Sequence, residues 1–78
     1  MSLKSKFSSE ALRARTALGL TQQEVADAVS TSVRWYQHIE KGTFMPGNVL
    51  MLRLIFFLEL DIEVFREEEE INVPVRSR

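Results

Sequence analysis

Two short helical segments separated by only three residues constrain the fold of this 78-residue chain more than any other feature. The first begins at Thr21-Gln22-Gln23-Glu24, a capping box in which threonine and glutamate side chains cap the same helix end. After Ser30-Thr31-Ser32 a second segment begins, again behind a hydroxyl residue, and Gly42 ends it. Because the connection is so short, we expect the two helices to cross at a steep angle.

Apolar spacing predicts which sides of these two helices are buried. Val25, Ala26 and Val29 face inward from the first helix, and the small Ala26 lets the two backbones approach closely. Tyr36 and Ile39 face inward from the second. Its outer face then carries Arg34, Gln37, His38 and Lys41 at helical spacing, with Val33 beside them. Such side chains reach base edges and phosphates of DNA, although on an isolated helix they would indicate only a solvated surface.

Three other segments are predicted to be helical. The first opens at Ser8-Ser9-Glu10 and ends at Gly19. Its apolar stripe consists of Phe7, Ala11, Leu12, Ala14 and Leu18. A fourth helix follows Pro46-Gly47-Asn48 and covers about residues 49–58, and Asp61 caps a short fifth helix. The chain is therefore predicted to be all-α.

The charge distribution is compatible with DNA binding, although the net charge is −1. Residues 1–42 contain six lysine and arginine residues against four acidic residues, whereas residues 43–78 contain four against seven. One face can therefore meet phosphate while the acidic half is turned away. The basic excess is small, so this pattern supports DNA binding without requiring it.

The residue types present exclude most other site chemistries. There is no cysteine, and one histidine alone does not complete a metal site. No nucleophile–base pair, paired carboxylates or glycine-rich phosphate loop occurs, so we expect neither catalysis nor a cofactor. No apolar run follows Lys4 and Lys6, and the longest apolar stretch, Leu54–Leu58, is too short to span a bilayer. We therefore expect a cytoplasmic protein.

The motif Leu20-Thr21-Gln22-Gln23-Glu24-Val25-Ala26, followed by Tyr36-Gln37-His38-Ile39-Glu40-Lys41-Gly42, resembles the phage-repressor/Cro (XRE-like) helix-turn-helix family. The resemblance extends from about Phe7 to Phe65 without a gap. It implies a compact five-helix, lambda-repressor-like DNA-binding domain over residues 7–66. The recognition helix Val33–Lys41 would enter the major groove.

The same resemblance implies a role for each exposed residue of the motif. Base contacts would come from Ser32, Val33, Arg34, Gln37 and His38. Backbone contacts would come from Thr31, Lys41 and Thr43, and Gln22 would lie against a phosphate and the first base pair. Arg15 and Glu40 would form a partly buried, structural ion pair between the first and third helices.

Three residues depart from the family pattern. Ser30 stands where the turn usually has glycine, and a left-handed backbone costs a non-glycine residue about 1–2 kcal/mol. Val33 replaces a polar reader, so it would contact a thymine methyl group or no base at all. Trp35 is unusual at its position, and the pattern leaves open whether it packs on the core edge or lies exposed near DNA or a partner.

The fourth helix is more apolar than one side of a small core can hide. By family alignment, Met51, Leu54, Ile55 and Leu58 should be core. Val49, Leu50, Phe56 and Phe57 are then left for a partner, and we expect a homodimer that reads two half-sites about 34–36 Å apart. The acidic run Glu67–Glu70 opens a tail, residues 67–78, that is either disordered or a short dimerisation arm.

Three functional classes remain open. The first is a sequence-specific regulator of transcription, acting as a repressor, that binds an operator in double-stranded DNA as a dimer. The second is a DNA-binding antitoxin that also holds a toxin. The third is a protein-interaction module that has kept the fold and lost DNA binding. Gln22, Arg34 and Lys41 favour the first two classes, whereas the acidic total and Val33 are compatible with the third.

Overall fold

A computed structural model describes residues 2–65, and among these residues it contains four α-helices, one 3₁₀ turn and no strand. The elements are α1 (Leu3–Leu18), α2 (Gln22–Ala28), α3 (Val33–Lys41), α4 (Asn48–Leu58) and η1 (Ile62–Phe65). The all-α prediction is confirmed, with the fifth segment a single 3₁₀ turn instead of an α-helix. The predicted acidic tail, residues 67–78, lies outside the described residues.

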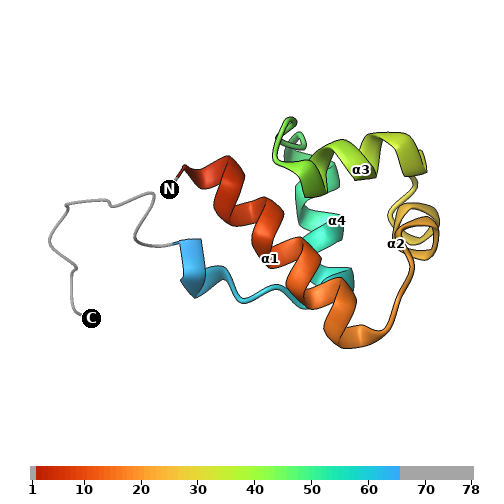
Figure 1. Ribbon diagram of the computed structural model, residues 1–78, viewed down its shortest axis with the longest axis horizontal. Helices are drawn as coiled ribbons and strands as arrows, with labels where there is room; N and C mark the ends of the chain where they lie inside the picture. Colours follow the sequence, from red (N-terminus) through yellow and green to blue (C-terminus); the bar gives the residue numbers. More distant parts are fainter. Residues whose placement is uncertain (1, 66–78) are drawn as a thin grey trace, which may run out of the picture.

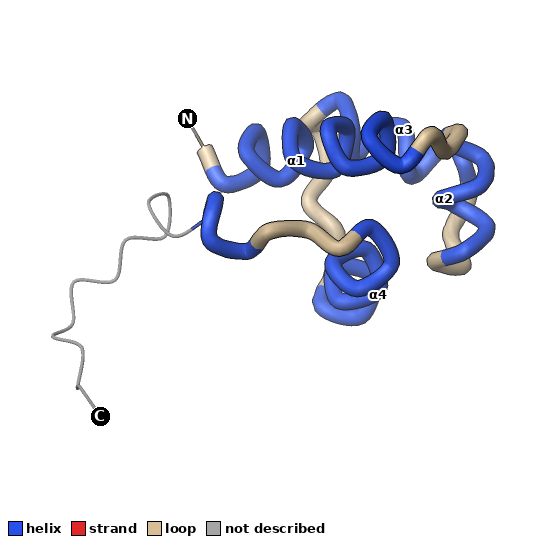
Figure 2. Tube along the Cα trace, turned by 90° about the horizontal axis from the view of Figure 1, so that it is seen from below, coloured by secondary structure: helices blue, strands red, loops and turns tan. Residues whose placement is uncertain are grey.

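The helices surround one small core. Figure 1 shows α3 beside the middle of α1, with α2 at the far end of α3 and η1 against the N-terminal half of α1. In Figure 2, α1 and α3 form one layer and α4 is seen end-on beneath them. The outer side of α3 is therefore left uncovered by the other described elements. No described helix is long and apolar enough to cross a membrane.

The core draws on every α-helix. Its buried apolar residues are Phe7, Ala11, Ala14, Val25, Ala26, Val29, Tyr36, Ile39, Leu54, Leu58 and Leu60. The predicted inward faces of α2 and α3 are confirmed, but the predicted stripe of α1 is wrong at two positions. Leu12 and Leu18 are 44% and 48% exposed. Leu18 is the last residue of α1, and the chain turns at Gly19 so that Leu20 packs on the core instead.

The predicted start of the first helix is also wrong. α1 begins at Leu3, and the Ser2 hydroxyl caps it by accepting a hydrogen bond from the Ser5 amide. Ser8 is buried in the helix, where its hydroxyl donates to the Glu40 carbonyl oxygen at 2.5 Å. A hydroxyl residue is typical of a helix start, but the place of Ser8 inside α1 is explained by its hydrogen bond to Glu40, a residue distant in the sequence.

Glu10 is likewise a tertiary contact and does not belong to a first helical turn. It is 6% exposed, accepts two hydrogen bonds from Arg13, and accepts a third from the Asp61 amide. The Arg13 hydrogen bond is the main reason that the pKa of Glu10 lies below its ordinary value. This carboxylate fastens the segment before η1 to α1. Asp61 itself caps η1, as predicted, by accepting from the Glu63 amide.

α2 and α3 both begin at the predicted caps. Thr21 and Glu24 form a complete capping box, and the Ser32 hydroxyl accepts from the Trp35 amide. Ser30 adopts a left-handed backbone with φ of 62°, the conformation expected to be costly without glycine. The Thr31 amide then donates to the Ala26 carbonyl at 2.9 Å, which closes the turn.

α4 differs from its predicted burial at Leu50. Leu54 and Leu58 are fully buried, and Met51 and Ile55 are half-buried against the core. Leu50 is half-buried in the same way, whereas it was expected to be exposed. Leu52 takes its place on the outer side and is 52% exposed.

Candidate nucleic-acid interface

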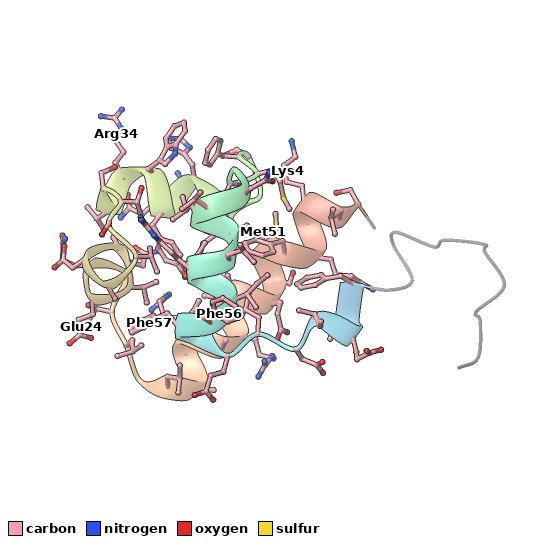
Figure 3. All side chains as sticks on the ribbon, turned by 180° about the vertical axis from the view of Figure 1, so that it is seen from behind. Lys4, Glu24, Arg34, Met51, Phe56 and Phe57 are labelled. Carbon is pink, nitrogen blue, oxygen red and sulfur yellow. The ribbon has the colours of Figure 1, made fainter. Side chains whose placement is uncertain are left out.

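The outer side of α3 presents polar side chains along its whole length. Arg34, Gln37 and Lys41 are exposed, and His38 lies between them, half-buried. Figure 3 shows Arg34 extending from α3 away from the body of the protein. Ser32 is exposed at the N-terminus of α3, although its hydroxyl is engaged as the cap. The structure therefore brings most predicted reading residues onto one accessible face.

Val33 is not part of this exposed stripe. It is half-buried and packs against the core. Val33 was expected on the outer face of α3, but in the first turn of the helix its side chain packs against the core. Of the two alternatives left open for Val33, the thymine contact has little free apolar surface to support it.

Gln22 joins α2 to α3 through a chain of hydrogen bonds. Its Nε2 donates to Glu40 Oε1 at 2.9 Å, and its Oε1 accepts from Gln37 Nε2 at 3.1 Å. These residues and Lys41 line a shallow hollow beside the outer face of α3. Gln22 thereby fixes the direction of Gln37, whose exposed amide carries both a donor and an acceptor.

Arg15 and Glu40 form a bidentate ion pair between α1 and α3. The two N–O distances are 2.5 and 3.1 Å, and Arg15 also donates to the Leu20 carbonyl at 2.8 Å. Their side chains are 17% and 6% exposed. Burial alone would raise the pKa of Glu40, but hydrogen bonds from Arg15 and Gln22, together with the nearby Tyr36 hydroxyl, outweigh it and hold that pKa below its ordinary value.

The hydroxyl of Tyr36 lies beside this ion pair. It is buried, and its own desolvation is the main reason that its pKa is raised. The hydroxyl makes no hydrogen bond to a described residue, but its closeness to Glu40 contributes to the low pKa of that carboxylate. Both the Glu40 carboxylate and the Tyr36 phenol are thus enclosed behind the outer face of α3. We therefore expect them to hold the helix in place and not to contact a partner.

The loop after α3 carries Thr43 and an aromatic pair. Thr43 is exposed, and its hydroxyl lies 3.1 Å from His38 Nδ1. Phe44 packs against Trp35 with ring centroids 3.8 Å apart and ring planes inclined by 47°, and Trp35 meets His38 edge-on at 6.0 Å. Trp35 remains 44% exposed. It therefore combines the two alternatives left open, packing at the edge of the core while keeping a free surface.

Two further residues flank the reading face. Thr31 is half-buried in the turn before α3. Lys4, near the start of α1, extends toward the same side of the protein as Arg34 (Figure 3). Sequence patterns did not single out Lys4, because only the packing of α1 beside α3 places it there.

A second exposed surface, the apolar face of α4, consists of Val49, Leu52, Phe56 and Phe57. Their exposed fractions are 62%, 52%, 74% and 40%. Figure 3 shows Phe56 and Phe57 on α4, away from the edge where Arg34 projects. Positions 49, 52 and 56 follow i, i+3, i+7 spacing, which is the signal that identifies Leu52 in place of Leu50.

Comparison with known proteins agrees with this geometry. A model of the helix-turn-helix family matches residues 12–65, a span that includes α2, the turn and α3. A search of curated proteins found no match. The chain belongs to the XRE family of helix-turn-helix proteins (the Cro/C1 type), which makes it a DNA-binding protein of the transcription-regulator class.

Proposed function

We propose that this protein is a sequence-specific transcriptional repressor that binds an operator in double-stranded DNA as a homodimer. The observation that carries the proposal is the uncovered outer face of α3, where Arg34, Gln37 and Lys41 are exposed side by side. Exposed donors on a helix that none of the other described elements covers can enter the major groove. In this proposal, the protein has no catalytic activity and acts in the cytoplasm.

The proposed contacts divide by chemistry. Arg34 is the principal base reader, since guanidinium binds guanine O6 and N7 in a bidentate manner. Gln37 contacts a base through its side-chain amide. Because Gln22 holds that amide in one direction, the main role of Gln22 is that of a positioning residue. Ser32 and His38 lie beside these two on the same face. Backbone contacts come from Thr31, Lys41 and Thr43, with Lys4 as an added cation at the edge.

Homodimerisation is proposed through the apolar face of α4. Single exposed apolar residues are normal on a protein surface, but α4 exposes four large apolar side chains together, which is typical of a surface that binds a partner. Because Phe56 and Phe57 lie on α4 away from the Arg34 edge, a second copy could bind them without covering Arg34 (Figure 3). A two-fold dimer of such domains reads half-sites about 34–36 Å apart.

The test is selection of bound duplexes from a random library at low salt. We expect a motif with two inverted half-sites, and an affinity for it that falls steeply with added salt because phosphate contacts release counterions. Regulation is then tested with a reporter gene whose promoter contains the selected motif, where repression is expected. Failure to enrich any motif with folded protein would contradict sequence-specific binding, and activation of the reporter would contradict the repressor role.

A further inference from the structure

The recognition helix carries an exposed apolar surface that core packing does not require. Trp35 is the large hydrophobic residue of α3 that remains exposed, at 44%. It follows Arg34 directly, and it meets His38, which lies on the outer face, edge-on. Val33, by contrast, packs on the core. The apolar surface available beside Arg34 therefore belongs to Trp35.

The indole ring is held in place from below. Phe44 packs against the core and contacts Trp35 with ring centroids 3.8 Å apart and ring planes inclined by 47°. His38 is held in turn by its contact with Thr43 at 3.1 Å. We call Trp35, His38 and Phe44 the aromatic shelf. Because the shelf is built on a helix and on a core-packed ring, little side-chain entropy remains to be lost when a ligand meets it.

The chemistry of the shelf favours one feature of DNA. A phosphate requires cations or several hydrogen-bond donors, whereas an indole offers an apolar surface and one N–H. The major groove presents one apolar group, the C5 methyl of thymine. A fixed indole edge next to Arg34 can bury that methyl while the guanidinium binds the neighbouring base pair.

We propose that Trp35 reads a thymine methyl group adjacent to the base pair contacted by Arg34, an inference that rests on the DNA binding proposed above. Phe44 is a positioning residue, since it touches Trp35 and holds the indole at the groove.

The experiment uses the duplex selected by the wild-type protein, with each thymine replaced in turn by deoxyuridine. That replacement removes the methyl group and leaves every hydrogen bond in place. At one position in each half-site, we expect deoxyuridine to weaken wild-type binding about threefold to tenfold, the value of burying one methyl-sized group. Trp35→Ala should bind the thymine and deoxyuridine duplexes equally, and Phe44→Leu should show a reduced difference.

Leu12→Ala is the matched control, because Leu12 is also 44% exposed but lies on α1. It should keep the full preference for thymine. Should Trp35→Ala fail to fold in thermal unfolding, the wild-type protein still provides a readout. Trp35 is the single tryptophan of the chain, so its emission should change more with the thymine duplex than with the sensitive deoxyuridine duplex.

The possible failures are distinguishable. If the wild-type protein binds no duplex, the proposed function itself fails. If it binds a selected duplex but no deoxyuridine replacement weakens binding, the assignment of Trp35 is overturned while DNA binding stands. Retention of the thymine preference by folded Trp35→Ala would overturn the assignment in the same way.

Discussion

Single residues of α3 differ in how firmly the protein holds them. Gln37 is bonded to Gln22, and Glu40 is enclosed by Arg15 and Tyr36, whereas Arg34 and Lys41 extend into solvent. The held residues keep the helix in position, and the free cations are available to DNA. Substitutions at these two kinds of residue should therefore fail in different ways.

Arg34 and Lys41 provide the first contrast. Arg34→Ala should relax base preference at one position of the selected motif by about 1–3 kcal/mol, because a bidentate base contact is lost. Lys41→Ala should weaken all sequences alike and reduce the slope of log affinity against log salt by about 1, as expected for one phosphate contact. Duplex titrations at several salt concentrations measure both effects. Equal loss on every sequence for Arg34→Ala would contradict its role as a base reader.

The Arg15–Glu40 pair is expected to act on stability. Arg15→Met leaves a carboxylate that is 6% exposed without its cation, which should lower the free energy of unfolding by about 3 kcal/mol. Adding Glu40→Gln to Arg15→Met removes the stranded charge and should recover much of the loss. Urea unfolding of the two variants provides the comparison. An Arg15→Met protein as stable as wild type would show that the pair contributes nothing.

The same carboxylate makes stability depend on pH. Because the pKa of folded Glu40 lies below its ordinary value of 4.5, the unfolded chain binds more protons in acid. Its contribution is complete above about pH 4.5 and is lost as the pH falls through the folded pKa. Glu10 acts in the same direction. Glu40→Gln should therefore flatten the acid limb of unfolding free energy against pH, and an unchanged limb would contradict the assignment.

At the scale of elements, the turn between α2 and α3 includes a strained backbone. Ser30 has φ of 62°, which glycine adopts without a steric penalty. Ser30→Gly should raise the free energy of unfolding by about 1 kcal/mol, after part of the gain is offset by chain entropy. Ala17→Gly, in exposed helical backbone of α1, should lower it by about 0.5–1 kcal/mol. A loss of stability in Ser30→Gly would show that the serine side chain supports the turn.

Local chemistry explains which elements could be predicted from the sequence. The caps at Thr21 and Ser32 and the stops at Gly19 and Gly42 depend on neighbouring residues, and each is found where expected. The buried faces of α2 and α3 followed from apolar spacing. The polar outer face of α3 consists of the positions that the buried apolar spacing leaves over. Most of the candidate site could therefore also be predicted from the sequence.

Residues with distant partners could not be placed in this way. Ser8 and Glu10 resemble helix-start residues until the Glu40 carbonyl and the Asp61 amide are seen beside them. Leu50 and Leu52 are equally apolar, and the packing of α4 on the core shows that Leu50 is half-buried and Leu52 exposed. The contact between Trp35 and Phe44 likewise depends on the loop after α3 folding back.

For the whole molecule, two exposed surfaces on different sides imply two partners at once. In the proposed function, the outer face of α3 meets DNA and the apolar face of α4 meets a second copy. Phe56 is the most exposed large apolar residue of α4, at 74%. Phe56→Glu should make the protein monomeric in sedimentation at micromolar concentration, because a charge cannot be buried unpaired in that contact.

The same substitution should weaken binding to a duplex with two half-sites about a hundredfold, since linked binding is lost, and leave a single half-site unaffected. Leu12→Glu, on α1, is the control and should leave both properties unchanged. A wild-type protein that remains monomeric on DNA would contradict the dimer.

The role of α3 in DNA binding can be tested with a map of backbone amide chemical shifts as the selected duplex is added to the wild-type protein. We expect the largest changes at Arg34, Gln37, His38 and Lys41, with smaller ones at Gln22 and Thr43 and little change at Leu12. Changes concentrated elsewhere, with α3 unaffected, would contradict the assignment of α3 as the DNA-reading helix.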